Sequence, residues 1–165
     1  MTSLQLALAP YSTWVQKPNG DNPFNLACRI DPGASAEEIR LAWPRGEVDK
    51  DLSDLWTATR EAWLFVDVEY GQWGLHLLTA KACADQTAAQ RAQRPDDFAA
   101  DDIVFGEFLG DSELLVCASR ELDDRRYLIA LPLDPRSDWP AAGSSVSAVL
   151  DRYLASEGEK YWESG

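Results

Sequence analysis

The chain has little of the chemistry that catalytic and metal sites need. Its 165 residues include one histidine, one methionine and three widely spaced cysteines. An odd, scattered set of cysteines fits free thiols in a reducing compartment better than a disulfide framework or a zinc site. No apolar run reaches the roughly 18 residues that a membrane-spanning helix needs, and the first residues lack the pattern of a secretory signal. We therefore expect a cytoplasmic protein that does not enter a membrane.

Familiar catalytic motifs are also missing. The sequence has no Gly-x-Ser-x-Gly elbow and no phosphate-binding P-loop. The lone histidine, His76, lies in an apolar run, where a packed or surface side chain is the usual outcome. The carboxylates of Asp101, Asp102, Glu107 and Asp111 are close in sequence, but adjacent strand residues point to opposite faces, which disfavours a magnesium site. We predict no catalytic residue, no metal and no cofactor.

The chain is rich in apolar residues and in negative charge. It is 45% hydrophobic with seven tryptophans, which indicates a packed core. The net charge is −13, and residues 96–124 contain ten acidic residues against a single base, Arg120. Such a surface repels nucleic acid and anionic membranes and speeds encounter with a basic partner. The alternative is that the acidic residues serve only solubility.

Local patterns predict one α+β domain with a mainly antiparallel sheet and helices before, within and after it. Apolar periodicity and capping residues predict helices over 35–43, 49–59, 79–94 and 146–157. β-prone runs predict strands at 62–68, 73–78, 103–109, 112–118 and 126–131, and a short strand within 4–14. Short turns between the strands favour antiparallel pairing, and we expect the helices to gather on one side of the sheet.

The most informative segment is 101–117, where two apolar runs flank the dipeptide Gly110-Asp111. Gly-Asp between such runs predicts a tight hairpin, because glycine takes positive φ without steric cost. Residues 103–109 are apolar on both alternating faces, which is typical of a central strand covered on both sides. The second cover would be the N-terminal segment or a partner protein.

The expected organisation is an N-terminal extension over 1–34 packed on the domain, the α+β domain over 35–158, and a C-terminal tail over 159–165. Within the extension, Asn19-Gly20 between two prolines is typical of a turn.

Two segments carry a family resemblance: residues 70–75, Tyr-Gly-Gln-Trp-Gly-Leu, and residues 106–115, Gly-Glu-Phe-Leu-Gly-Asp-Ser-Glu-Leu-Leu. They resemble the core of the SUKH superfamily, the Smi/Knr-type domain. A helix pair before the first of these segments and a helix at the end are also similar. Residues 43–52 match the family pattern loosely, and the first 30 or so residues have no family counterpart. The resemblance implies an α+β fold and, for most bacterial members, an immunity protein that neutralises a cognate polymorphic toxin, often a nuclease or deaminase.

We therefore expect a non-catalytic protein-binding module, an immunity protein that covers the basic active-site surface of its toxin without binding nucleic acid itself. An intracellular regulatory or scaffold protein is the alternative, and a carboxylate- or metal-dependent enzyme is the third interpretation. The residues expected to contact the partner are Asp101, Asp102, Glu107, Asp111 and Glu113, with Trp73 as an aromatic anchor.

Overall fold

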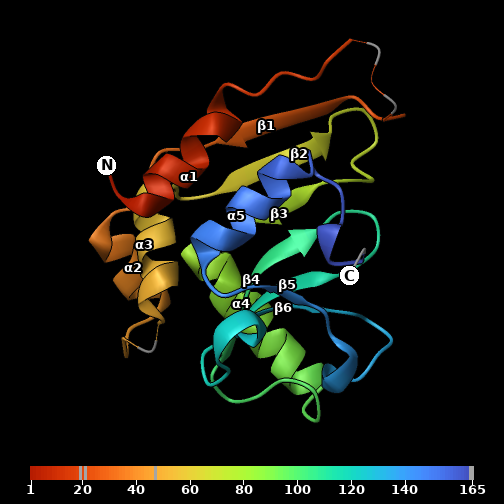
Figure 1. The fold of residues 1–165 in the computed structure, drawn as a ribbon. Coiled ribbons are helices and arrows are strands. Elements are labelled where there is room, and N and C mark those ends of the chain that lie inside the picture. Colours follow the sequence, from red (N-terminus) through yellow and green to blue (C-terminus); the bar gives the residue numbers. More distant parts are fainter. Residues whose placement is uncertain (19, 21, 47, 164–165) are drawn as a thin grey trace.

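The fold is organised around one antiparallel sheet (Figure 1). The computed structural model describes residues 1–18, 20, 22–46 and 48–163. Within this part of the chain the sheet has seven strands, and each strand pairs with the next one along the sequence. The strands are β1 Leu26–Ile30, β2 Ala62–Asp67, β3 Leu75–Leu77, β4 Asp102–Phe108, β5 Leu114–Ala118, β6 Tyr127–Ala130 and β7 Ala141–Gly143. The predicted α+β class with a mainly antiparallel sheet is confirmed.

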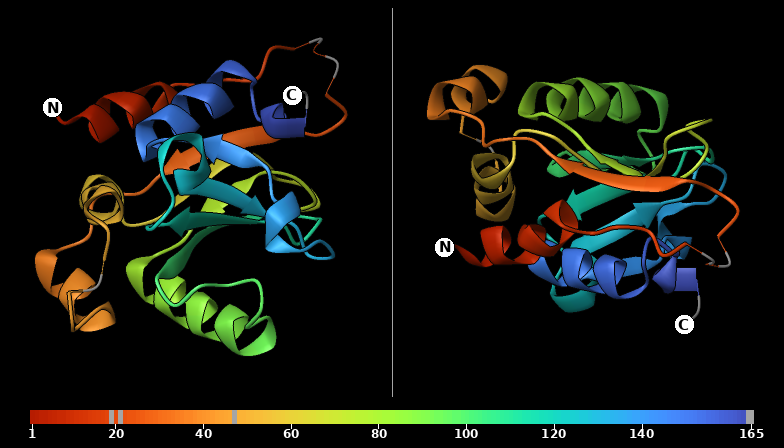
Figure 2. Two further views of the ribbon diagram at one scale, coloured as in Figure 1. Left: turned by 60° about the horizontal axis from the view of Figure 1, so that its bottom comes forward. Right: turned by 90° about the horizontal axis from the view of Figure 1, so that it is seen from above.

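Helices cover both faces of the sheet (Figure 2). The α-helices are α1 Ser3–Ser12, α2 Ala36–Ala42, α3 Lys50–Ala58, α4 Ala80–Gln93 and α5 Val146–Ala155, and short 3₁₀ helices are η1 Asp123–Arg126, η2 Arg136–Asp138 and η3 Tyr161–Glu163. Helices α1 and α5 lie side by side on one face, and α4 lies on the other. The expectation that the helices gather on one side is therefore wrong. None of the helices in the described part of the chain combines the length and apolar character that crossing a bilayer requires.

Capping residues begin three of the helices where the sequence predicts them. The side chains of Ser35, Asp49 and Thr79 each accept a backbone N–H in the first turn of α2, α3 and α4. The last helix follows its apolar periodicity, with Ser145 as its N-cap, and it ends at Ala155 with Ser156 as its C-cap. The backbone is then left-handed at Glu157 and Gly158, with φ of +51° and +87°.

Helix α1 replaces the short strand that the sequence analysis predicts within residues 4–14. Thr2 and Gln5 form a reciprocal capping box, which starts the helix. Leu4, Leu8 and Tyr11 fall on one helical face and are buried. The Tyr11 hydroxyl donates a hydrogen bond of 2.6 Å to the Leu150 carbonyl of α5. The helical period of these residues therefore outweighs their strand propensity.

Within residues 1–34, expected to form an extension, the described elements α1 and β1 belong to the same core as the rest of the domain. Strand β1 pairs antiparallel with β2, and α1 packs against α5. The tail is also packed, because the Tyr161 hydroxyl donates to the Ala142 carbonyl at 2.7 Å. The turn predicted at Asn19-Gly20 lies outside the described residues, since Asn19 is not among them.

Strand β4 is apolar on both faces because both faces are covered, as the sequence predicts. Phe105 belongs to the large cluster shared with α1, α3 and α5. Val104 belongs to a smaller cluster with Phe98, which follows α4, and Trp139. The second cover is therefore part of the domain itself.

Candidate functional site

The acidic residues expected to bind a partner do not form one patch. Asp101 and Asp102 lie at the start of β4, Glu107 lies near its end, and Asp111 and Glu113 lie beyond it in the loop to β5. A single stretch of sequence is thus spread along the length of a strand and its hairpin.

The two acids at the start of β4 are engaged in ion pairs. Asp102 is 1% exposed, accepts the Ala99 backbone N–H at 2.7 Å and pairs with the Arg136 guanidinium at 3.0 Å. Asp101 pairs with Arg120 at 2.8 Å. Asp102 is therefore a buried structural residue in this arrangement, and the structure gives a partner no access to it.

Arginines from elsewhere in the chain neutralise part of the acidic run at 96–124. Arg94 pairs with Asp97 at 3.0 Å, and Arg136 reaches both Asp102 and Glu121. Exposed acids of the run that have no ion pair among the described residues are Asp96, Asp123 and Asp124. The charge visible in sequence is consequently larger than the charge that the folded surface presents.

Two turns meet at the other end of β4. The Leu109 backbone N–H donates to the Gly74 carbonyl at 2.8 Å, which joins the β4–β5 loop to the β2–β3 turn. Gly110 has a φ of +98°, and a Cβ built on it would lie 2.1 Å from the Gln72 carbonyl oxygen. The predicted hairpin is present, but its loop spans residues 109–113 and is wider than the tight turn predicted at Gly110-Asp111. Glycine is required at position 110 both by the positive φ and by the close contact with Gln72.

A buried carboxylate fixes the backbone of the β2–β3 turn. Asp67 is 2% exposed and accepts backbone N–H groups from Glu69, Tyr70 and Gln72 at 3.1–3.3 Å. A carboxylate that accepts several turn amides fixes the turn as a capping residue fixes a helix. This places Trp73 and Gly74 in a fixed position beside the β4–β5 loop.

Three of the predicted residues come together around Lys160. The Lys160 ammonium pairs with Asp111 and lies 3.2 Å from Glu113 Oε1. It also lies 5.5 Å from the centre of the Trp73 ring, whose indole N–H donates to the Gly158 carbonyl at 3.2 Å. We call Trp73, Asp111, Glu113 and Lys160 the hairpin corner. Trp73 is partly buried and stacks on Phe24, so it contributes packing as well as a ring face.

Glu113 is the most constrained group of the corner. It is 9% exposed, and its Oε2 atom is buried without a hydrogen-bond partner among the described residues. Burial raises the pKa of its carboxyl above the usual value, and the negative charge of Asp111 adds to the increase, while Lys160 opposes it. A buried carboxyl with a raised pKa beside a charged partner marks a candidate binding site.

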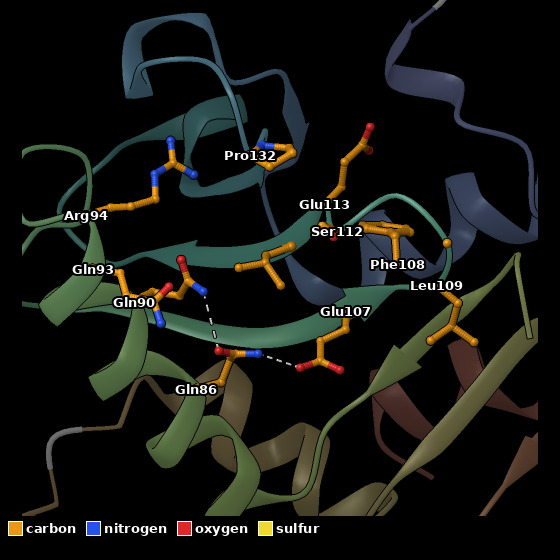
Figure 3. A pocket seen from close by; sticks show the side chains of 12 residues that line it. Gln86, Gln90, Gln93, Arg94, Glu107, Phe108, Leu109, Ser112, Glu113 and Pro132 are labelled. Atoms are coloured by element: carbon orange, nitrogen blue, oxygen red, sulfur yellow. Dashed lines mark hydrogen bonds between the residues drawn. The ribbon is translucent and has the colours of Figure 1, made fainter.

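Glu107 lies in a groove next to the hairpin corner, and Glu113 lines the same groove (Figure 3). Its carboxylate accepts the Gln86 side-chain amide at 2.6 Å. The groove has a volume of about 600 Å³ and runs between α4 and the strands β4 and β5. Its helical wall is a row of glutamines, Gln86, Gln90 and Gln93. Figure 3 shows Glu107 pointing toward Gln86 and Glu113 pointing away from it.

The glutamine row is a site feature that the sequence analysis does not single out. Gln86, Gln90 and Gln93 are spaced four and three residues apart, which places them on one face of a helix. The signal is present in the sequence as a polar stripe on a predicted helix. We call this row, together with Glu107, the glutamine groove.

At the end of the groove, Arg94 donates to Asp97 and to the backbone carbonyls of Leu131 and Asp134. The Arg94 guanidinium is therefore engaged in hydrogen bonds within the domain. The groove thus offers amide donors and acceptors with negative charge near Glu107, a chemistry suited to a polypeptide that carries basic side chains.

The remaining reactive side chains lie elsewhere. His76 stacks on Trp63 with ring centres 3.5 Å apart, and its Nε2 atom lies 2.7 Å from the Glu61 carboxylate. The cysteines are free thiols, and burial raises the pKa of Cys28 to about 11 and of Cys117 to about 12. Both thiols are therefore protonated at neutral pH, which suppresses nucleophilic reactivity.

Among the residues that the structure describes, no group of three or more histidine, cysteine, aspartate or glutamate side chains is arranged to hold a metal ion. The hairpin corner and the glutamine groove instead offer carboxylates, amides and an aromatic ring. Comparison with protein-family models, with curated proteins and with solved structures found no match to this chain.

The contact between the two turns predicts different costs for two glycine substitutions. Gly71→Ala requires only a positive φ, since nothing lies within 4 Å of the added Cβ, and it should cost about 1 kcal/mol. Gly110→Ala adds an overlap with the Gln72 carbonyl and should cost roughly 2–4 kcal/mol. Urea denaturation of both variants measures the difference. Equal costs would mean that the turns do not press against each other at Gly110.

The raised pKa of Glu113 predicts a pH-dependent effect of Glu113→Gln. A carboxyl whose pKa is higher in the folded than in the unfolded chain stabilises the fold below its unfolded pKa of about 4.3, and this contribution is lost as pH rises through the folded pKa. The wild type should therefore lose stability relative to the glutamine variant as pH rises from about 4 toward neutrality. Urea unfolding across this range tests the sign. A glutamine variant that becomes relatively less stable with rising pH would show that the ion pair with Lys160 dominates.

Proposed function

We propose that this protein is a non-catalytic protein-binding module of the immunity type, which neutralises a cognate toxin by covering a basic surface. The observation that carries the proposal is the juxtaposition of the hairpin corner and the glutamine groove on the β4–β5 hairpin. Three carboxylates, Glu107, Asp111 and Glu113, accompany one ammonium there. The local excess of negative charge has the same sign as the whole chain.

The chemistry of the groove supports a polypeptide ligand. Side-chain amides of Gln86 and Gln90 offer donors and acceptors that match a peptide backbone, and Glu107 offers a carboxylate to a basic side chain. A nuclease or deaminase presents lysines and arginines where it holds phosphates, so an acidic protein can occupy that surface competitively. Charge would set the association rate, and the packed contacts would set the lifetime of the complex.

The resemblance to the SUKH superfamily adds support from a second direction. The two segments that carry it, residues 70–75 and 106–115, are in direct contact through Leu109, Gly74 and Gly110. Two segments that are far apart in sequence support a family resemblance more strongly when they contact each other in the structure. The family as a whole is rich in interaction proteins, which agrees with a binding role.

A regulatory or scaffold protein of its own cell is the alternative function, and it uses the same binding surface with a different partner. A carboxylate-dependent enzyme requires titratable groups that converge in a pocket. Glu107 and Glu113 both line the groove, but Glu107 points toward Gln86 and Glu113 points away from it, so the two carboxylates do not converge there, which favours binding over catalysis.

The partner to test is a toxin domain, sought among the genes beside this one. Association measured by stopped flow should slow at least about tenfold between 0.05 and 0.5 M salt, because salt screens exposed charges. Gln90→Lys, on the groove wall, should weaken binding about tenfold. Ala88→Lys is the matched control, since it adds the same charge to an exposed position of α4 outside the groove.

Two outcomes would contradict the proposal. An association rate that does not change with salt concentration would exclude a mainly electrostatic encounter. Equal changes in affinity for Gln90→Lys and Ala88→Lys would place the interface away from the groove. A neighbouring gene without a toxin domain would favour the regulatory alternative.

A further inference from the structure

Lys160 is held by the chain as a bound cation would be. Its ammonium contacts the carboxylates of Asp111 and Glu113 and lies 5.5 Å from the Trp73 ring centre. Its side chain is 14% exposed. Two carboxylates and an aromatic face are the elements from which proteins build sites for cationic groups.

This arrangement leaves the carboxylates incompletely satisfied. Glu113 Oε1 faces Lys160, but the buried Oε2 has no partner among the described residues. One ammonium also balances only one of the two negative charges. A buried carboxylate oxygen that accepts no hydrogen bond destabilises the folded state. A donor group that bonded to this oxygen would recover that free energy. The corner is therefore a site with more acceptor capacity than Lys160 uses.

A guanidinium group matches this unused capacity better than an ammonium. It is planar and presents parallel N–H donors that bond both oxygens of one carboxylate. The same plane stacks on an aromatic ring, as an ammonium cannot. Glu113 with Trp73 supplies both partners, and Asp111 supplies a second carboxylate.

We propose that the hairpin corner is an arginine-recognition site, which Lys160 occupies in the free protein and an arginine side chain of the partner occupies in the complex. This inference rests on the proposed function, because it names the partner group that the surface binds. Lys160 then acts as an internal competitor, which lowers the apparent affinity for arginine by the fraction of time for which it fills the site.

The exchange requires movement of one side chain only. The tail around Lys160 is held by the hydrogen bond from Tyr161 to the Ala142 carbonyl and by packing of Trp162 on Phe108, with ring centres 5.0 Å apart. The flexible lysine can therefore swing into solvent while the tail stays in place. Glu113 also lines the glutamine groove, so a segment bound in the groove reaches the corner.

The test uses the purified protein and the blocked tripeptide acetyl-Gly-Arg-Gly-amide, followed by two-dimensional NMR of the Trp73 indole N–H. Lys160→Met removes the ammonium and keeps the apolar stem. This variant should bind the arginine peptide about tenfold more tightly than the wild type. The corresponding lysine peptide should bind more weakly than the arginine peptide, because it cannot bond both oxygens of Glu113.

A second variant controls for misfolding of Lys160→Met. Lys160→Met leaves two carboxylates without a cation, whereas Lys160→Met with Asp111→Asn keeps the net charge of the corner and should show the same gain. Adding Glu113→Gln to this double variant should remove the gain. If neither lysine variant binds the arginine peptide more tightly than the wild type, Lys160 is a structural ion pair and the inference is overturned.

Failure of this test is distinguishable from failure of the proposed function. A toxin domain that binds with the expected dependence on salt and on the groove, in a protein whose corner ignores arginine, leaves the binding module intact and removes only the arginine site. Loss of toxin binding with a retained arginine site removes the proposed function and leaves the arginine site standing.

Discussion

The close approach of the β4–β5 loop to the β2–β3 turn is the constraint on which the candidate site depends. A glycine is required at position 110 because its φ is +98° and the Gln72 carbonyl occupies the space of a side chain. The Leu109 N–H then reaches the Gly74 carbonyl, and the buried Asp67 holds the second turn in place. Without this contact the ring of Trp73 would not lie beside the carboxylates of the loop.

The second constraint is electrostatic. The corner places the carboxylates of Asp111 and Glu113 around the single ammonium of Lys160. Burial of Glu113 raises the pKa of its carboxyl and so disfavours the ionised form. A fold that maximised stability alone would replace such a group by a better-satisfied one. Retaining it is understandable where the carboxylate has a ligand outside the chain, which is the physical link between the proposed function and the arginine site.

Much of the fold is predictable from local sequence patterns. The helices that begin after Ser35, Asp49 and Thr79 follow from their caps, and the strands of the central hairpins follow from apolar runs between turns. Helix α1 carries an equally readable signal in Thr2 and Gln5. Its interpretation as a strand gives β-propensity more weight than the helical period. The sequence patterns do not predict strands β1 and β7, because pairing with their neighbours decides the conformation of these two segments.

The candidate site is predictable only in part, because it depends on contacts between distant residues. The acidic run predicts the sign of the charge, but Arg94 and Arg136 lie outside the run and neutralise members of it. Lys160 lies 49 residues from Asp111 in sequence, so no local pattern connects them. Neighbouring acids of the hairpin also point in different directions, since Glu107 points toward Gln86 and Glu113 points away from it and contacts Lys160.

The central claim is that the β4–β5 hairpin and the adjoining wall of α4 form the partner-binding surface. Its most direct test is hydrogen exchange of the protein in complex with a toxin domain identified among the neighbouring genes. The account predicts slower amide exchange on binding in residues 86–93 and 106–115, with the exposed surface of α5, on the opposite face of the sheet, unchanged. Slower exchange confined to α1 and α5, or to α2 and α3, with no change in the hairpin, would contradict it.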